Sequence, residues 1–283
     1  MSNSIMKTRI APSPTGYMHI GTARTAYFNW LAAKAAGGEF ILRIDDTDAA
    51  RSDSKYTEAI FKAMEMLGLD YDAVFHQSDR TMVYRDYLDV LQHNGRLMFK
   101  DNAYYLRTDD MPSSWKDEIA GDIAISDADK EFIKELVLFK SDGTPTYNFA
   151  STIDDIQTGI TCVIRGVDHI SNTPKQIAIY NALGAKLPSY YHIGLIMGQD
   201  GKKLSKRHGA SSVVDYEDFH PEALLNLMLR MGWGPTVDDK STAIITRESA
   251  LRMFWEGGKM RSSPSKLDAD KLKWFDKKYR HAH

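Results

Sequence analysis

The sequence predicts an α/β fold built on a parallel sheet, with a short insertion and a mainly helical C-terminal region. Strand-like and helix-like patterns alternate through the first 68 residues, and this alternation returns after residue 146. Such alternation is typical of Rossmann-type sheets. The chain has 283 residues, of which 43% are hydrophobic, so it can bury a sizeable core. We expect residues 1–78 to form the first half of the sheet domain, 79–145 an insertion, 146–196 the second half, and 197–283 a loop and a helical domain.

Two strand–helix units are predicted in the first half. The apolar runs at 7–11 and 39–44 are typical of short buried strands. The helical patterns at 22–36 and 54–68 both run into glycine, which commonly ends a helix. These units predict neighbouring parallel strands connected by helices.

The alternation is interrupted between residues 79 and 145. Residues 80–93 look helical and 103–107 strand-like, and an acidic part at 108–135 is expected to be rich in loops. The α/β pattern then resumes. It comprises the segment 147–156, a strand at 161–166 and a helix at 174–184, followed by a Gly-, Ser- and Lys-rich loop at 197–212 and helix-like segments to the end.

Composition excludes several classes of protein. No run of 18 apolar residues predicts a spanning helix, and residues 1–16 lack the apolar core of a signal peptide. The single cysteine, Cys162, allows neither an internal disulfide nor a Cys-rich zinc site, and it fits a reducing compartment. We therefore expect a cytoplasmic protein without membrane contact. Because the net charge is only −2, any surface for nucleic acid must be a local patch.

The stretch APSPTGYMHIGT, residues 11–22, joins the first strand pattern to the first helix pattern. Its two prolines restrict φ, and Gly16 permits a tight reversal. His19 and Gly21 follow, at the expected start of the helix, where free N–H groups and a partial positive charge suit phosphate. Taken alone, the stretch fits a structural turn with a surface histidine equally well.

A second motif, KKLSKRHG, is dense in cations. Lys203 and Lys206 belong to a run of four basic residues within six positions, flanked by glycines. Ammonium groups in such a loop can clamp a polyphosphate while charge shifts during transfer. A solvated basic loop explains this motif alone, but the two motifs together, at opposite ends of the α/β region, are far more specific.

Five segments in this order resemble class I aminoacyl-tRNA synthetases, and most closely the catalytic half of bacterial glutamyl-tRNA synthetase. They are RIAPSPTGYMHIGTARTAYFNWL, LRIDDTD, KSDGTPTYNFA, VIRGVDHISNTPKQI and KLSKR. Residues 19–22 are similar to the family's HIGH signature and 203–207 to its KMSKS signature. The resemblance covers about residues 8–209 and, more weakly, the chain up to 279. It implies a Rossmann-type catalytic domain followed by a helical stem-contact domain.

The family's reaction forms glutamyl-adenylate and pyrophosphate from glutamate and ATP with Mg²⁺, and then passes the glutamyl group to the 3′-terminal adenosine of tRNA. It needs alignment and charge stabilisation rather than a covalent nucleophile. The resemblance implies His19, Gly21, Thr22, Lys203 and Lys206 as catalytic residues. It implies His19, Gly21, Asp168, Leu195, Ile196 and Lys206 as ATP-binding residues.

Glutamate carries two carboxylates and an ammonium group, and the resemblance implies a partner for each. The implied glutamate-binding residues are Arg9, Ala11, Ser13, Asp45, Tyr147 and Arg165. Arg165 matches the partner of the side-chain carboxylate, for which a guanidinium fork is suited. Alternatives are a surface arginine at 165 and a packing aromatic at 147. Asp45 stands where the family usually has Glu, so its contact with the ammonium group is expected to be longer or bridged by water.

The insertion and the C-terminal region bear on the acceptor. The insertion lacks the family's zinc-binding cysteines, so neither zinc nor another protein-bound metal is expected. Residues 109–135 have nine acidic residues against three lysines, which is the wrong sign for a phosphate backbone. Residues 259–280 have eight basic residues against three acidic ones, which fits either a tRNA contact or a solvated helix face. The family's anticodon-binding half is not matched, so the resemblance implies a stand-alone, monomeric core that meets the acceptor end of a tRNA.

Three functions remain open at this point. The leading one is a truncated glutamate–tRNA ligase, which charges its tRNA conventionally or, like glutamyl-queuosine tRNA(Asp) synthetase, transfers glutamate to a modified base. The acidic insertion motivates a second, in which glutamate passes to a small amine or a protein. The third is a non-catalytic module that binds ATP or glutamate, which the intact His19, Lys206 and Arg165 disfavour.

Overall fold

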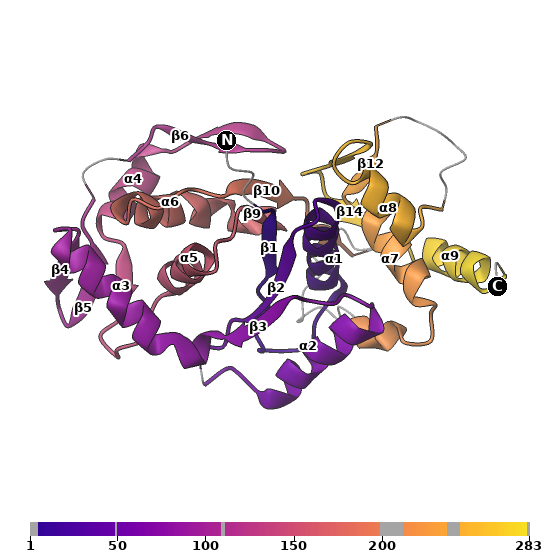
Figure 1. Cartoon of the computed structure of the whole chain (residues 1–283), viewed down its shortest axis with the longest axis horizontal. Coiled ribbons are helices and arrows are strands. Elements are labelled where there is room, and N and C mark those ends of the chain that lie inside the picture. Colours follow the sequence, from indigo (N-terminus) through magenta and orange to yellow (C-terminus); the bar gives the residue numbers. More distant parts are fainter. Residues whose placement is uncertain (1–4, 49, 109–110, 199–211, 237–243, 282–283) are drawn as a thin grey trace.

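The first half of the sheet domain forms a parallel sheet, as the sequence predicts, and this sheet has three strands (Figure 1). A computed structural model describes residues 5–48, 50–108, 111–198, 212–236 and 244–281. The elements of the first half are β1 (Lys7–Ile10), α1 (Ile20–Ala35), β2 (Glu39–Ile44), α2 (Ser54–Met66), β3 (Ala73–His76) and the 3-10 helix η1 (Gln77–Arg80). The order β1–β2–β3 with helical crossovers confirms the predicted strand–helix units and adds β3 as a third strand.

The middle of the chain is more regular than the sequence predicts. It contains α3 (Thr81–His93), β4 (Leu97–Lys100), β5 (Ala103–Leu106), β6 (Ser114–Asp117), β7 (Gly121–Ala124), α4 (Asp127–Lys134) and β8 (Val137–Phe139). The expectation of a loop-rich part at 108–135 is wrong, because β6, β7 and α4 lie within it. Ser126 caps α4, and Asp127 and Asp129 occupy its first turn, where acidic groups favour the helix dipole. Part of the acidity therefore marks a helix start.

The second half forms another mainly parallel sheet, which continues the first. Its elements are α5 (Tyr147–Gln157), β9 (Cys162–Gly166), the 3-10 helix η2 (Val167–Asn172), α6 (Thr173–Ala182) and β10 (Ser189–Ile193). The strand order β7–β6–β10–β9 shows that the insertion contributes two strands to this sheet. β9 lies beside β1, since the Thr161 amide donates to the Lys7 carbonyl at 3.0 Å and the Lys7 amide donates to the Thr161 hydroxyl at 2.8 Å.

The C-terminal region is mainly helical, as predicted, and packs against α1. Its elements are β11 (Ile196–Met197), the 3-10 helix η4 (Val213–Tyr216), α7 (Pro221–Arg230), β12 (Trp233–Pro235), α8 (Arg247–Met253), β13 (Gly258–Met260), β14 (Ser265–Lys266) and α9 (Ala269–His281). Two short pairings, β12 with β13 and β11 with β14, accompany the helices. Within the described ranges, no helix is long and apolar enough to cross a bilayer.

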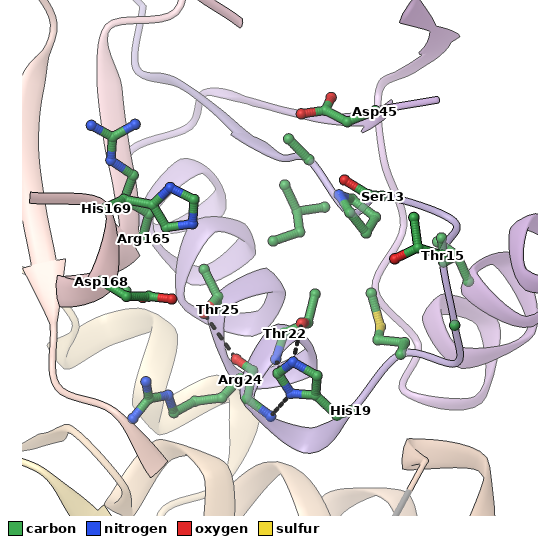
Figure 2. Close-up of a pocket in the computed structure, with 18 of the residues that line it drawn as sticks. Ser13, Thr15, His19, Thr22, Arg24, Thr25, Asp45, Arg165, Asp168 and His169 are labelled. Atoms are coloured by element: carbon green, nitrogen blue, oxygen red, sulfur yellow. Dashed lines mark hydrogen bonds between the residues drawn. The ribbon is translucent and has the colours of Figure 1, made fainter. Parts of the chain in front are cut away.

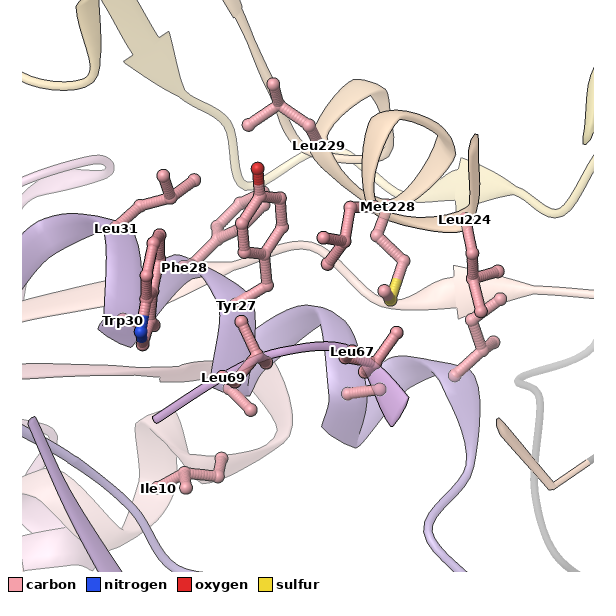
Figure 3. Close-up of a cluster of buried hydrophobic side chains, with 14 of the residues drawn as sticks. Ile10, Tyr27, Phe28, Trp30, Leu31, Leu67, Leu69, Leu224, Met228 and Leu229 are labelled. Atoms are coloured by element: carbon pink, nitrogen blue, oxygen red, sulfur yellow. The ribbon is translucent and has the colours of Figure 1, made fainter. Parts of the chain in front are cut away.

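The main core lies between the first sheet, α1 and α7 (Figure 3). Phe28 and Leu31 of α1 are fully buried, as are Met228 and Leu229 of α7. Each such side chain stabilises the fold by about 1.5–3 kcal/mol relative to its exposed state. Because α1 is packed by the sheet on one side and by α7 on another, its N-terminus is held firmly at the end of β1.

Candidate functional site

A pocket of about 370 Å³ lies beyond the carboxyl ends of β1 and β9, beside the N-terminus of α1 (Figure 2). This is where ligands bind in open parallel sheets, and the volume is within the usual range for small-molecule sites. Of the candidate residues, those that the structure describes all line this pocket. They are Arg9, Ala11, Ser13, His19, Gly21, Thr22, Asp45, Tyr147, Arg165, Asp168, Leu195 and Ile196. Lys203 and Lys206 lie outside the described residues.

His19 caps the helix that it precedes. Its Nδ1 accepts hydrogen bonds from the amides of Gly21, at 3.1 Å, and Thr22, at 3.3 Å. We therefore assign the neutral ring with its proton on Nε2, which lies 3.3 Å from the Thr22 hydroxyl. The structure differs here from the expectation that the N–H groups at this helix start are free to bind phosphate. Two of the free amides of α1 are already bonded to the His19 ring, and a Cβ at Gly21 would lie 3.0 Å from that ring.

Arg9 on β1 is paired within the protein. Its Nε and Nη2 donate to the carboxylate of Asp155 on α5, at 3.1 and 3.2 Å, and both side chains are buried. The resemblance implies that Arg9 binds a carboxylate of glutamate. In the structure, the carboxylate of Asp155 already pairs with Arg9. Ala11 and Ser13 follow β1 along the chain and contribute to the pocket wall.

Asp45 follows β2 and is held by Arg43, a residue that the sequence analysis missed. The Arg43 guanidinium donates to both Asp45 oxygens, at 2.6 and 3.1 Å, and to Asp155 at 2.9 Å. Burial raises the pKa of Asp45 to about 6, against the opposing effect of Arg43. The only sequence signal for Arg43 is a charged residue within the apolar run EFILRI.

Asp154 and Asp155, which the sequence analysis left out of the site, belong to the same buried ion network. Asp154 accepts hydrogen bonds from Arg80 at 2.7 Å, from Gln77 at 2.7 Å and from the Tyr84 hydroxyl at 3.0 Å. These partners come from η1 and α3, so the network ties the start of the insertion to α5. The two carboxylates therefore act as structural counter-charges beneath the pocket.

Arg165, at the end of β9, has only neutral partners in direct contact among the residues with described positions. Its Nε donates to His192 at 3.0 Å, its Nη1 to Gln176 at 2.8 Å and its Nη2 to Thr173 at 2.8 Å. The side chain is 5% exposed, so the alternative of a surface arginine is wrong. Burial lowers the pKa of Arg165, because the charged form has lost its water. A buried guanidinium without a contacting carboxylate favours an anionic ligand.

His169 lies beside Arg165 in the pocket (Figure 2), and Tyr147 is a neighbouring residue of the pocket wall. Tyr147 begins α5, and its hydroxyl lies 3.3 Å from Nδ1 of His169. Its exposed fraction of 39% argues against a purely packing role. Burial, reinforced by the Arg165 charge, lowers the pKa of His169 to about 4, so the ring is neutral at pH 7. The sequence analysis missed His169, although it stands four positions after Arg165.

Asp168, Leu195 and Ile196 also line the pocket, and Asp168 lies close to Arg165 and His169 (Figure 2). The Asp168 carboxylate lies against the Gly166 backbone, where a Cβ would be 2.3 Å from its Oδ1. Arg24 of α1, which the sequence analysis also missed, donates to the carbonyls of Gly194 at 2.5 Å and Met231 at 2.6 Å. Burial lowers its pKa to about 10. Arg24 thereby links α1, the strand end before Leu195 and the C-terminal region.

Comparison with known proteins places this chain in a family. A family model described as "tRNA synthetases class I (E and Q), catalytic domain" matches residues 5–104 and 96–274. Glutamate–tRNA ligase 1 of Helicobacter hepaticus is 41% identical over 96% of this chain and 66% of its own length. The glutamate–tRNA ligase of Nitrosospira multiformis is 38% identical over 97% of this chain and 66% of its own length.

Solved structures agree with this. A crystal structure of a glutamate tRNA ligase from Elizabethkingia meningosepticum in complex with its amino acid has a TM-score of 0.86 at 28% identity, covering 99% of this chain and 70% of that one. The chain thus spans about two thirds of the length of the curated relatives it matches. With the family model matching most of the chain, and with the expected α/β fold and pocket in place, the chain belongs to the class I tRNA synthetases of the E and Q type.

Proposed function

We propose that this protein activates L-glutamate with ATP and transfers the glutamyl group to a tRNA. The observation that carries the proposal is the buried Arg165 guanidinium, whose direct partners in the described part of the chain are neutral. An anionic side chain of the substrate would complete its charge, whereas a neutral glutamine side chain would not. The names of the relatives, glutamate–tRNA ligases, support the same substrate.

The pocket suggests how the groups meet. The side-chain carboxylate of glutamate accepts hydrogen bonds from Arg165, and the ammonium group lies against Asp45. The α-phosphate of ATP sits at the N-terminus of α1, where Nε2–H of His19, 3.3 Å from the Thr22 hydroxyl, would turn to donate to it. An oxygen of the α-carboxylate of glutamate then attacks the α-phosphorus and the bond to pyrophosphate breaks. The resemblance to the KMSKS signature assigns Lys206 to stabilise the leaving charge. A hydroxyl of the terminal adenosine of tRNA next attacks the activated carbonyl, and AMP leaves.

Mg²⁺ belongs to this proposal as a companion of the ATP phosphates. Among the described residues, no group of three or more His, Cys, Asp or Glu side chains is arranged to hold a metal ion. The cytoplasmic location, the monomeric state and the four-part domain division remain predictions from the sequence. The exposed lysines of α9, among them Lys271, Lys277 and Lys278, are the surface we propose for tRNA contact.

The decisive experiment is ATP–pyrophosphate exchange assayed with each amino acid, with and without total tRNA, followed by locating labelled glutamate. Exchange that depends on glutamate supports the proposal. If no exchange occurs under any of these conditions and calorimetry shows that ATP or glutamate still binds, the protein is a non-catalytic binding module and the proposal fails.

The position of the label identifies the acceptor. Label at the 3′ end of tRNA indicates conventional charging, label on an internal base of tRNA(Asp) indicates the queuosine-type reaction, and RNase-resistant label indicates a small amine or a protein. Lys206→Ala is a simple check. Because Lys206 is assigned to the transition state, this substitution is expected to reduce kcat more than it raises the KM for ATP.

A further inference from the structure

Asp117 is a buried carboxylate that reaches the second-half sheet from the insertion. It ends β6 and is completely buried. Its Oδ1 accepts hydrogen bonds from the amides of Ile119, at 3.0 Å, and Ala120, at 2.8 Å. Its Oδ2 accepts from the amide of His192 at 3.1 Å and from the ring Nδ1 of His192 at 2.7 Å. Four donors therefore surround the carboxylate and fix its orientation.

His192 on β10 connects this carboxylate to Arg165. Because Nδ1–H donates to Asp117, the unprotonated Nε2 is left as an acceptor, and Nε of Arg165 donates to it at 3.0 Å. Burial lowers the pKa of His192 although Asp117 opposes this effect, so the ring is neutral. The rings of Trp115 and Tyr190 pack against the imidazole, with centroids 5.5 and 6.3 Å away, and hold its plane.

The three buried arginines Arg9, Arg43 and Arg165, of which Arg9 and Arg165 line the pocket, differ in how they are paired. Arg9 and Arg43 both touch the carboxylate of Asp155 directly. Arg165 instead meets a carboxylate only through an imidazole, within the part of the chain that the structure describes. Direct contact would let a protein carboxylate take the place of the substrate's. The interposed ring orients the guanidinium and keeps the negative charge one side chain away.

We propose that His192 and Asp117 are positioning residues for the side-chain carboxylate of the substrate. They hold Arg165 at the pocket wall without neutralising it, while Gln176 and Thr173 fix the outer nitrogens. This inference rests on the proposed function. Because Asp117 comes from β6, it also gives the insertion a part in selecting the amino acid, in addition to any part it has in binding the acceptor.

Two substitutions at His192 separate positioning from packing. His192→Leu removes the acceptor for Nε of Arg165, whereas the amide oxygen of His192→Gln can still accept that hydrogen bond. In glutamate-dependent ATP–pyrophosphate exchange, we expect His192→Leu to raise the KM for glutamate about tenfold or more, since a hydrogen bond to a charged group is at stake. The KM for ATP should stay within about twofold of wild type, and His192→Gln should keep the KM for glutamate within about threefold.

Asp117→Asn disturbs the same chain without touching Arg165. The backbone amides of Ile119 and Ala120 keep the amide oxygen at the Oδ1 position, so the new NH₂ group faces both the backbone amide and the Nδ1–H of His192. Two donors then oppose each other, the ring shifts its proton to Nε2, and the acceptor for Arg165 is lost. The KM for glutamate should rise as in His192→Leu. Tyr180→Phe is the matched control, because its buried hydroxyl has no hydrogen-bond partner among the described residues.

The outcomes are distinct. The proposal is overturned if folded His192→Leu and Asp117→Asn keep the KM for glutamate within twofold of wild type, or if His192→Gln fails like His192→Leu with both KM values and kcat changing together. If the wild type shows no exchange with glutamate, the proposed function fails instead. The positioning claim is then decided by ¹⁵N NMR of the His192 ring. A neutral Nδ1–H tautomer that is lost in Asp117→Asn supports the claim, and a protonated or Nε2–H ring in the wild type refutes it.

Discussion

Replacing Gly21 by alanine separates the stability of α1 from the placement of the His19 ring. The new Cβ would lie 3.0 Å from both Cε1 and Nδ1 of His19, so the ring must move away from the amides that it caps. Loss of an N-cap costs about 1 kcal/mol. Alanine is favoured over glycine within a helix by up to about 1 kcal/mol. The two effects nearly cancel, so the free energy of unfolding should change by less than about 1 kcal/mol.

Activity should not be spared in the same way. If Nε2–H of His19 donates to a phosphate of ATP, displacing the ring removes a hydrogen bond to a charged group, worth about 1.5–3 kcal/mol. This corresponds to a loss of roughly 10- to 150-fold in the exchange rate. The assay pairs urea unfolding, followed by tryptophan fluorescence, with ATP–pyrophosphate exchange at saturating glutamate.

Two further variants complete the test. His19→Asn retains a strong N-cap but has no imidazole. Its free energy of unfolding should therefore stay close to that of wild type, and its exchange rate should fall as much as that of Gly21→Ala. Gly234→Ala is the control, because its Cβ would meet only the flexible end of the Arg261 side chain, at 3.2 Å. The reasoning is refuted if Gly21→Ala exchanges within twofold of wild type, or if it loses more than about 2 kcal/mol of stability, since the cap and helix effects would then not offset each other.

The remaining predictions concern charge. Asp155→Asn removes a carboxylate that Arg9 and Arg43 share, so the free energy of unfolding in urea should fall by about 3–5 kcal/mol, and a loss below 1 kcal/mol would contradict a structural role. The KM for glutamate should rise about tenfold per pH unit below pH 6, because Asp45 becomes protonated there and loses its attraction for the ammonium group. A KM that stays constant down to about pH 5 would exclude Asp45 from that contact. Lys271→Ala and Lys277→Ala should each make the salt dependence of tRNA binding shallower by about one unit on a log–log plot, and an unchanged slope would remove α9 from the tRNA surface.

Short-range sequence patterns predicted β1, β2 and α1 correctly. The apolar runs of β1 and β2 and the helix of α1 appear within a few residues of their predicted bounds, because burial and glycine stops act over short distances. The β6–β7 hairpin was missed because its pairing with β10 joins residues more than 70 positions apart, as Asp117 and Tyr190 show. No composition rule reveals that pairing.

The site divides in the same way. The candidates chosen by motif resemblance all line one pocket where the structure describes them. The resemblance did not show which of their polar groups already have hydrogen-bond partners within the protein. The contact between Arg9 and Asp155 spans 146 positions, and the cap by His19 depends on how the ring turns. Arg24 and Arg43 escaped notice because a charge inside an apolar pattern looks like an exposed position until its partners are known.

The links from Arg24 to Gly194 and Met231, together with the pairing of β11 with β14, make the pocket wall at Leu195 and Ile196 depend on both the N-terminal and the C-terminal parts of the chain. A shortened enzyme that stopped after the second-half sheet would lack the partner of β11 and leave one nitrogen of Arg24 without its acceptor. The smallest unit able to present a complete pocket therefore extends past residue 266. Efforts to miniaturise such an enzyme should trim loops between elements, and leave the last strand in place.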